Sequence, residues 1–402
     1  MRSLRTWIDT LEQQGELHRV SAEVDWDEEL TAITYMRAQD PDSPALLFEN
    51  VEGYDNRRVL SNILSTSLNR IGHTFNIDTF DTELDLIRQL REAYSKTIPP
   101  ETVTDGPVLE NTKTGNDIDL YEFPAPKMWP KDGGRYLGTA NYTIMRHPAK
   151  EWLNTAVYRG MIQGDDRVGL YVSPGKDARE IIDYWWDRGE PCEVAVSYGS
   201  DPLPFAMSAM SYGSGTSELD YIGGMYGEPV ELVDGRKTDI PFPASAEIVI
   251  EGHLEPGETM PEGPFGEFQG YYGRPEDDAY VIDVDAVHHR DDPILTAALI
   301  ADYPGCEQNL FLGLNKAAQT WDELETVGVS GVEGVYCPPS AHGGFGFTVV
   351  SIDQQQPGHA RQVAGLVAEF PTSGYINKYI VVVDDDVDPT DMDDVLWAMT
   401  TR

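Results

Sequence analysis

The chain has 402 residues, 40% of them apolar and 10% aromatic, which suits two or three globular domains and excludes a disordered protein. Its formal net charge of −40 at pH 7 would repel nucleic acid and anionic membrane surfaces, so we expect neither as a partner. No apolar run approaches the roughly 20 residues of a membrane span, and the first residues lack the apolar block of a signal peptide. We therefore expect a cytoplasmic protein with no membrane span.

Acidic residues are spread along the whole chain rather than gathered in a tail. Such a surface resembles that of proteins from salt-loving organisms, whose charges stay hydrated while salt screens their repulsion. Most of these carboxylates are therefore expected on a solvated surface. Cys192, Cys306 and Cys337 are well separated and give neither a metal-binding motif nor a disulfide framework.

Residues 1–118 are predicted to form an α/β domain. The first helix has Ser3 as its expected N-cap and Gly15 as the residue that closes it. The expected elements are helices at 3–14, 27–38 and 82–96 and strands at 45–51 and 59–63. A connection rich in Pro and Gly follows at 97–119.

Residues 119–296 are predicted to be mostly strands, with few helices. The expected elements are a hairpin of strands 154–163 and 168–173, a helix at 178–188, and strands at 192–198, 247–252 and 280–288. This composition is typical of a barrel or a sandwich.

Residues 297–402 return to an α/β pattern. The expected elements are a helix at 308–325, a strand at 347–352, a helix at 360–370, a buried strand at 378–383 and a last helix starting at 388–390. The sequence contains no internal repeat.

The stretch Met260–Gly270 carries two carboxylates, Glu262 and Glu267, in a segment of Pro and Gly that cannot form an ordinary helix. On a kinked loop the two carboxyl groups can converge on one cavity. Two close carboxylates suit acid–base chemistry, because their surroundings can keep one of them protonated near neutral pH. The alternative is a turn-rich surface loop in an acidic protein.

Several common sites are not indicated by the sequence. No Gly-x-Gly-x-x-Gly follows a strand, no His-Glu-x-x-His occurs, and no Gly-x-Ser-x-Gly elbow is present. A P-loop is excluded because the glycine spacing before Lys176 is one residue too long and no Ser or Thr follows. The pair His288–His289 is interpreted as structural.

Polar groups in the central region complete the candidate site. A strand bordering a cavity could present both Asn154 and Arg159, and an Arg between two Glu would hold one carboxylate ionised. The small-residue loop 208–218 could wrap a phosphate through backbone N–H groups, or be a plain flexible loop. These groups contain no electron sink, so difficult carbon chemistry would need a cofactor.

The sequence resembles the UbiD-type decarboxylases, which use prenylated FMN and include ferulic acid and polyprenyl-hydroxybenzoate decarboxylases. The resemblance runs from the first helix to the last residues. It is carried by the hairpin from Asn154 to Arg159, by Gly215-Thr-Ser-Glu-Leu-Asp-Tyr221, by Glu262-Gly-Pro-Phe-Gly-Glu267 and by Asn377-Lys-Tyr-Ile-Val-Val-Val-Asp-Asp-Asp386. Four such segments in the family's order make the resemblance specific.

The resemblance implies an N-terminal α/β domain, a central split β-barrel of the flavin-reductase type that binds the flavin, and a C-terminal α/β domain. It also implies that Arg159, Glu262 and Glu267 form the catalytic group. Glu267 would protonate the carbon that loses its carboxylate, while Arg159 would bind that carboxylate and, with Glu262, tune Glu267.

The family holds the flavin phosphate through a divalent metal, usually Mn²⁺, bound by Asn, His and Glu. Asn154 and Glu218 match two of these ligands, but we expect Lys176 at the place of the His. An ammonium has no lone pair, so Lys176 is expected to pair with the phosphate and to replace the ion partly or wholly. Met210 and Lys378 fall on further cofactor contacts of the family.

The expected function is non-oxidative, reversible decarboxylation of an α,β-unsaturated or (hetero)aromatic carboxylic acid by a homo-oligomer, with a flavin prenyltransferase as cofactor supplier. One alternative is a glycoside hydrolase that uses Glu262 and Glu267 as its carboxylate pair. The other is a family relative that has lost catalysis and serves in binding or assembly.

Overall fold

The computed structural model of the protein describes residues 2–147, 149, 152–212, 215–343, 345–374 and 376–402. They form two compact units that do not follow chain order. The first comprises residues 1–66, 97–209 and 213–307, and the second comprises residues 67–96, 210–212 and 308–402. In the described ranges, no helix combines the length and the apolar character that crossing a bilayer requires.

The first unit begins with a four-stranded sheet in the order β1-β2-β3-β17, as counted over the described residues. Its elements are α1 (Leu4–Gln14), β1 (Leu17–Val20), α2 (Glu29–Arg37), β2 (Ala45–Phe48), β3 (Arg58–Ser61) and β17 (Ile294–Thr296). Helix α1 has the predicted ends: Ser3 forms a capping box with Thr6, and Gly15 closes the helix with φ +76°.

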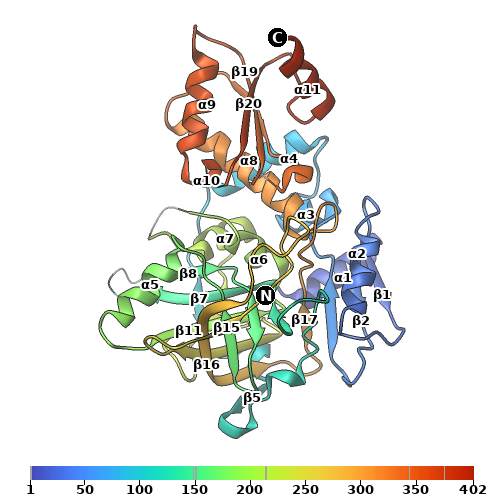
Figure 1. The fold of residues 1–402 in the computed structure, drawn as a ribbon, viewed down its shortest axis with the longest axis vertical. Helices are drawn as coiled ribbons and strands as arrows, with labels where there is room; N and C mark the ends of the chain where they lie inside the picture. Colours follow the sequence, from blue (N-terminus) through green and yellow to red (C-terminus); the bar gives the residue numbers. More distant parts are fainter. Residues whose placement is uncertain (1, 148, 150–151, 213–214, 344, 375) are drawn as a thin grey trace. The chain divides into compact units, whose positions relative to one another are not determined.

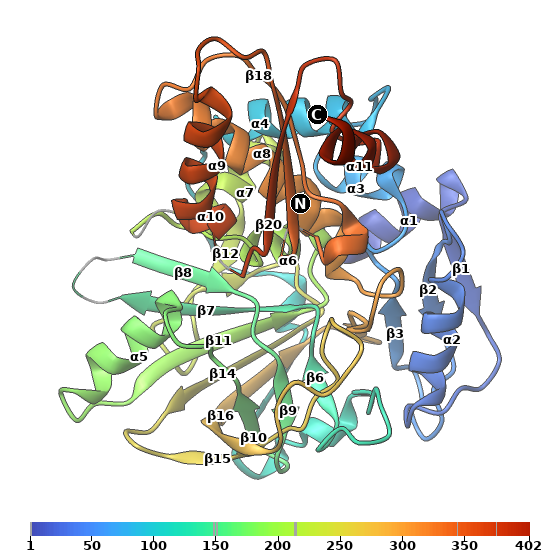
Figure 2. The ribbon, with the colours of Figure 1, turned by 45° about the horizontal axis from the view of Figure 1, so that its top comes forward.

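The centre of the first unit is a curled sheet of ten strands among the described residues, in the order β6-β9-β10-β16-β14-β11-β7-β8, with β5 and β15 paired to β16 (Figure 2). Its strands are β5 (Asn111–Thr114), β6 (Tyr136–Gly138), β7 (Asn141–His147), β8 (Trp152–Ala156), β9 (Gly160–Ile162), β10 (Arg167–Leu170), β11 (Cys192–Tyr198), β14 (Ile248–Leu254), β15 (Thr259–Glu262) and β16 (Asp277–His289). The remaining elements are α5 (Asp177–Trp186), α6 (Pro202–Ser208), α7 (Glu218–Tyr226) and a small sheet of β4 (Glu101–Val103), β12 (Glu231–Val233) and β13 (Phe242–Pro243).

The connection between β8 and β9 explains why the sheet curls. The three residues 157–159 join β8, at one end of the strand order, to β9 near the other end, so the two ends must approach each other. The predicted continuous strand 154–163 is therefore wrong, because the chain leaves one ladder and enters another at Arg159. Inside the curl the apolar side chains form one core, which includes Val194, Val196, Ile250, Ile282 and Val287. The predicted fold class, with a split barrel at its centre, is confirmed.

The second unit is built on a three-stranded sheet in the order β18-β19-β20, within the part of the chain that is described. Its elements are α3 (Leu68–Thr74), α4 (Glu83–Tyr94), α8 (Gln308–Thr326), β18 (Val332–Tyr336), β19 (Phe347–Ile352), α9 (His359–Glu369), α10 (Pro371–Gly374), β20 (Tyr379–Asp384) and α11 (Met392–Thr401). Helices α9 and α11 flank the sheet beside β20 (Figure 1).

Two predictions for the second unit need correction. Strand β20 was expected to be buried, but it is the edge strand and only Val383 among its residues is buried. The last helix starts at Met392 rather than at 388–390, because the Asp391 side chain caps it by accepting from the N–H groups of Asp393 and Asp394.

Candidate active site

Glu262 is the last residue of β15, which pairs with β16 and delivers the side chain into the protein interior, where it is fully buried. The chain then turns sharply and Gly263 adopts φ +85°, a conformation that favours glycine. A Cβ on Gly266 would lie 2.3 Å from Trp129, so this position also requires glycine. The Gly/Pro pattern thus allows the loop carrying Glu267 to return against the sheet.

Arg159 lies at the break between β8 and β9 and contacts both glutamates. Its Nε and Nη2 donate to Oε1 and Oε2 of Glu262 at 2.8 Å each, and its Nη1 donates to Oε1 of Glu267 at 2.8 Å. The Arg159 guanidinium carbon lies 4.5 Å from the ring centre of Tyr171 and 4.8 Å from that of Phe265. The structure therefore joins the three residues that the sequence singled out.

The electrostatics of the cluster favour a permanent positive charge on the arginine. Burial lowers the pKa of Arg159, but the hydrogen bonds and charges of Glu262 and Glu267 outweigh burial and raise it overall. Glu262 has both oxygens engaged, whereas the Glu267 carboxylate accepts a single hydrogen bond among the described residues and its side chain is 22% exposed. Glu267 is thus the carboxyl group with an oxygen available for proton transfer.

Tyr136 is a member of the cluster that the sequence reasoning missed. Its hydroxyl donates to Oε1 of Glu262 at 3.0 Å, and its ring packs on Phe265 with the centroids 4.6 Å apart. Burial and the Glu262 charge raise the pKa of Tyr136, so it remains a hydrogen-bond donor. No local pattern could have identified it, because 126 residues separate it from Glu262.

A second buried carboxylate, Glu218, lies at the start of α7, and both α5 and α7 contact β8. Asn154 Nδ2 donates to Oε1 of Glu218 at 3.3 Å, and the backbone N–H of Thr155 donates to its Oε2 at 2.7 Å. Burial raises the pKa of Glu218 to about 8, and the nearby carboxylate of Asp177 adds to this effect. A bound cation would stabilise the ionised form of this carboxylate.

Asp177 was also missed by the sequence reasoning, which stopped at its neighbour Lys176. Asp177 is the first residue of α5 and Lys176 is the N-cap. Burial lowers the pKa of Lys176, and the opposing charge that acts on it is Asp177. Asn154, Asp177 and Glu218 carry oxygen atoms, the type of ligand that suits Mg²⁺ and Mn²⁺, although no group of three or more His, Cys, Asp or Glu among the described residues is placed to hold a metal ion.

The two remaining predicted cofactor contacts belong to the second compact unit. Met210 is buried and is assigned with Lys378 to the second compact unit, where Lys378 directly precedes β20. Within the predicted phosphate loop 208–218, residues 213 and 214 lie outside the described residues. Ser208 donates or accepts a 2.7 Å hydrogen bond with Thr155, next to Glu218.

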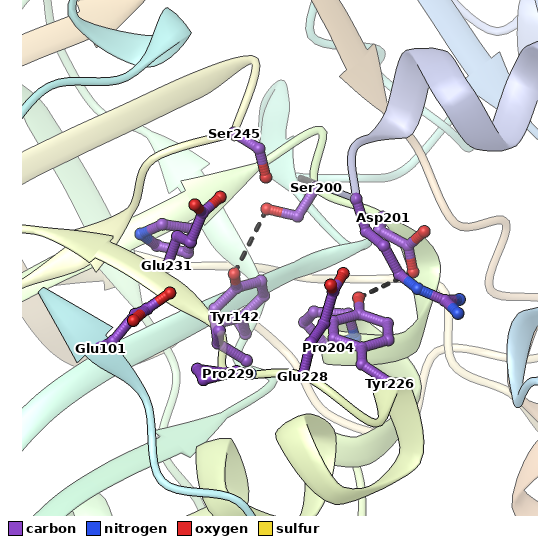
Figure 3. A pocket seen from close by; sticks show the side chains of 13 residues that line it. Glu101, Tyr142, Ser200, Asp201, Pro204, Tyr226, Glu228, Pro229, Glu231 and Ser245 are labelled. Carbon is purple, nitrogen blue, oxygen red and sulfur yellow. Dashed lines mark hydrogen bonds between the residues drawn. The ribbon is translucent and has the colours of Figure 1, made fainter. Parts of the chain in front are cut away.

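The first unit also has a cavity of about 120 Å³, and none of the predicted site residues lines it (Figure 3). Four carboxylates line it: Glu101, Asp201, Glu228 and Glu231. Tyr226 donates to Asp201 Oδ1 at 2.9 Å, and the guanidinium of Arg2 lies 4.8 Å from the Tyr226 ring centre.

Three family domains match consecutive parts of the chain. They are described as the N-terminal, Rift-related and C-terminal domains of 3-octaprenyl-4-hydroxybenzoate carboxy-lyase, UbiD, and they match residues 8–93, 101–303 and 309–402. The chain is 32% identical over 416 residues to a pyrrole-2-carboxylic acid decarboxylase of Pseudomonas aeruginosa, covering 99% of this chain and 82% of that protein.

Two solved structures are similar over the full chain. The vanillic acid decarboxylase of Sedimentibacter hydroxybenzoicus in its closed form has a TM-score of 0.91 at 28% identity, covering 100% of this chain and 85% of that one. The UbiD-class enzyme HmfF of Pelotomaculum thermopropionicum, in an evolved dimeric form with prFMN, has a TM-score of 0.89 at 30% identity, with 100% and 90% covered.

Proposed function

Because the chain belongs to the UbiD family of carboxy-lyases, we propose that it removes CO₂ without net oxidation from an α,β-unsaturated or (hetero)aromatic carboxylic acid, with prenylated FMN as cofactor. The observation that carries this proposal is the guanidinium of Arg159, which bridges Glu262 and Glu267 through three hydrogen bonds of 2.8 Å. Family membership decides against the glycoside hydrolase alternative.

Each of the three residues has a distinct task in the proposed reaction. Decarboxylation converts RCO₂⁻ and one proton into RH and CO₂, so the site must attract an anion and deliver a proton. Arg159 supplies the positive charge that orients the carboxylate, and Glu262 holds Arg159 in place by accepting from two of its nitrogens. Glu267 carries the proton on its available oxygen and gives it to the carbon that has lost CO₂.

Prenylated FMN, when bound, supplies the electron sink for the electrons of the broken carbon–carbon bond. HmfF, one of the similar structures, contains this cofactor. We propose that Asn154, Asp177 and Glu218 would hold a divalent cation such as Mn²⁺, rather than Lys176 replacing the ion, and that Lys176 would supply a further positive charge for the cofactor phosphate. Met210 and Lys378 are proposed as further cofactor contacts.

Elemental analysis of the flavin-loaded protein tests the cation. We expect one Mn²⁺ per flavin in the wild type and in Lys176→Ala, and loss of the metal in Asp177→Ala, with folding checked by circular dichroism. A flavin-loaded wild type without metal would contradict the three-oxygen site and leave Lys176 as the sole cation at the phosphate.

We further propose a cytoplasmic homo-oligomer that obtains its cofactor from a flavin prenyltransferase. The outer surface of α11 supports assembly, because Leu396, Trp397 and Met399 are about half exposed. The net charge of −40 favours a salt-rich milieu, in which screening reduces repulsion between subunits.

The experiment that tests the function starts from protein co-expressed with a flavin prenyltransferase and purified in high salt. Absorbance and mass spectrometry of the released ligand should reveal prenylated FMN, and CO₂ release should follow with part of a panel of aryl, heteroaryl and acrylic acids. Glu267→Gln is the inactive control. Cofactor loading without turnover of any acid would contradict the proposal and favour a non-catalytic relative.

A further inference from the structure

Glu267 lies on the wall of an open cavity of about 310 Å³ that is lined by residues of the first unit. The side chains that shape this cavity are Tyr35, Trp129, Glu267, Tyr271, Tyr272 and Asp302. A cavity of this size with aromatic walls suits a small planar ring.

The aromatic walls are fixed in place by their polar ends. Trp129 Nε1 donates to the carbonyl of Ile300 at 2.9 Å, and the Trp129 ring meets the Tyr35 ring edge to face at 5.7 Å. The Tyr272 hydroxyl accepts from the backbone N–H of Lys131 at 2.9 Å. Since these polar ends are already bonded, Trp129 and Tyr272 offer the cavity mainly their rings.

Asp302, an exposed residue, is the second acidic side chain that lines this cavity, besides Glu267. Its Oδ1 accepts from the Tyr35 hydroxyl at 2.9 Å, and no other side-chain hydrogen bond to Asp302 occurs among the described residues. The side chain packs against Gly270, where an added Cβ would lie 2.8 Å from the Asp302 Cβ. Asp302 is therefore held against the loop that carries Glu267, with Oδ2 left to accept a further hydrogen bond.

The described residues of the lining offer no positive charge. Glu267 and Asp302 are its acidic side chains, and none of the described residues that line the cavity is Lys, Arg or His. A second anionic group on a substrate ring would therefore meet a carboxylate with no counter-charge in the wall, whereas a ring N–H or O–H would find an acceptor.

We propose that Asp302 is a specificity-determining residue, which accepts a hydrogen bond from a ring N–H or O–H of a substrate monocarboxylic acid and rejects ring dicarboxylic acids. This inference rests on the proposed decarboxylase function and narrows its substrate class to small (hetero)aromatic monoacids with a hydrogen-bond donor.

The test compares three acids on the flavin-loaded enzyme: pyrrole-2-carboxylic, furan-2-carboxylic and furan-2,5-dicarboxylic acid. In the wild type, kcat/KM for the pyrrole acid should exceed that for the furan monoacid about tenfold, the size of one hydrogen bond to a charged acceptor near the surface. The diacid should be about tenfold poorer still, because of charge repulsion.

Two variants of Asp302 separate the preference for the pyrrole acid from the penalty on the diacid. Asp302→Asn keeps an acceptor but removes the charge, so the penalty on the diacid should shrink while the pyrrole preference survives. Asp302→Ala should abolish the pyrrole preference. Glu276→Gln, which removes an exposed carboxylate outside the cavity lining, should leave both ratios unchanged.

The same ratios should appear in the affinities of the three acids for the flavin-loaded Glu267→Gln protein, measured by calorimetry. Turnover or binding ratios that are equal in the wild type, Asp302→Asn and Asp302→Ala would overturn the role of Asp302 and leave the decarboxylase intact. Absence of turnover with every acid in the wild type would instead overturn the proposed function, and the binding ratios would then decide the inference alone.

Discussion

Two places at the curled sheet hold glutamates in opposite ways. Glu251 on β14 accepts from the backbone N–H groups of Arg236, Lys237 and Thr238, from the Thr238 hydroxyl, and is hydrogen-bonded to His288 at 2.7 Å. At the Arg159 cluster, Glu262 and Glu267 share one guanidinium and Glu267 keeps an oxygen without a partner among the described residues.

The difference separates a carboxylate held entirely by the fold from the carboxylates that we propose take part in the reaction. A carboxylate whose lone pairs are all taken by the fold stabilises the native state and cannot accept or donate a proton without loss. Although burial alone would raise the pKa of Glu251, the hydrogen bonds from His288 and the backbone lower it to about 2. This arrangement also explains His288, which was interpreted as structural from the sequence.

The largest expected effect is that of Glu267→Gln on turnover. The amide can still accept from Arg159 but carries no acidic proton, so kcat should fall about 10²–10⁴-fold, the usual range for a general acid. The thermal midpoint should stay within a few degrees of the wild type. CO₂ release and hydrogen–deuterium exchange at the product carbon measure the loss, and retention of more than a tenth of the wild-type rate would contradict the assignment.

Glu251→Gln should have the opposite effects: the stability of the fold should fall, and turnover should not change. The amide nitrogen would face N–H donors inside the protein, so the free energy of unfolding should fall by about 3 kcal/mol. Urea titration measures this loss, and kcat per folded molecule should be unchanged. A variant of normal stability with impaired turnover would assign Glu251 to the active site.

The lowered pKa of Glu251 predicts that the stability of the fold depends on pH. The folded pKa of Glu251, about 2, lies below its ordinary value of 4.5, so its contribution is present above about pH 4.5 and is lost as pH falls towards 2. The contribution amounts to about 3 kcal/mol at 1.36 kcal/mol for each unit of pKa. The stability gap between wild type and Glu251→Gln should therefore close on acidification below pH 4.5, and a constant gap would count against this origin.

Arg159→Lys tests whether a positive charge alone, placed between Glu262 and Glu267, is sufficient for turnover. Lysine keeps the charge but cannot bridge two carboxylates through a planar fork, so kcat/KM should fall about 10²-fold. Glu262 would lose a bidentate partner, and KM for the acid should rise along with the loss in kcat. Near-normal KM and kcat would mean that a point charge is enough to orient the substrate.

The sequence predicted those parts of the site that are close along the chain or carry strong local signals. Glu262 and Glu267 are five residues apart on a Gly/Pro loop, and β11 and β19 begin and end at the predicted residues, Cys192–Tyr198 and Phe347–Ile352. The break at residues 157–159 escaped prediction, because Val157 and Tyr158 are good strand formers and only the closing of the sheet interrupts them.

Long-range partners could not be predicted in this way. Tyr136 reaches Glu262 only through the curl of the sheet, and Asp177 approaches Glu218 only because α5 and α7 both pack on β8. The packing of α4 on α8, which joins residues 67–96 to the C-terminal part of the chain, likewise has no signature in local periodicity.

Tyr136→Phe should give the smallest of the expected effects. It tests directly how the Arg159 cluster differs from the site of Glu251. The phenyl ring keeps the contact with Phe265 and removes only the 3.0 Å hydrogen bond to Glu262, which retains both hydrogen bonds from Arg159. Losing one hydrogen bond to a charged group costs about 1.5–3 kcal/mol when nothing replaces it. Because Arg159 still pairs with both Glu262 oxygens, we expect the lower end, about tenfold in kcat/KM, with little change in the urea midpoint. A drop in stability without a change in kcat/KM would place Tyr136, like His288, among the residues that hold a carboxylate for the fold rather than for the reaction.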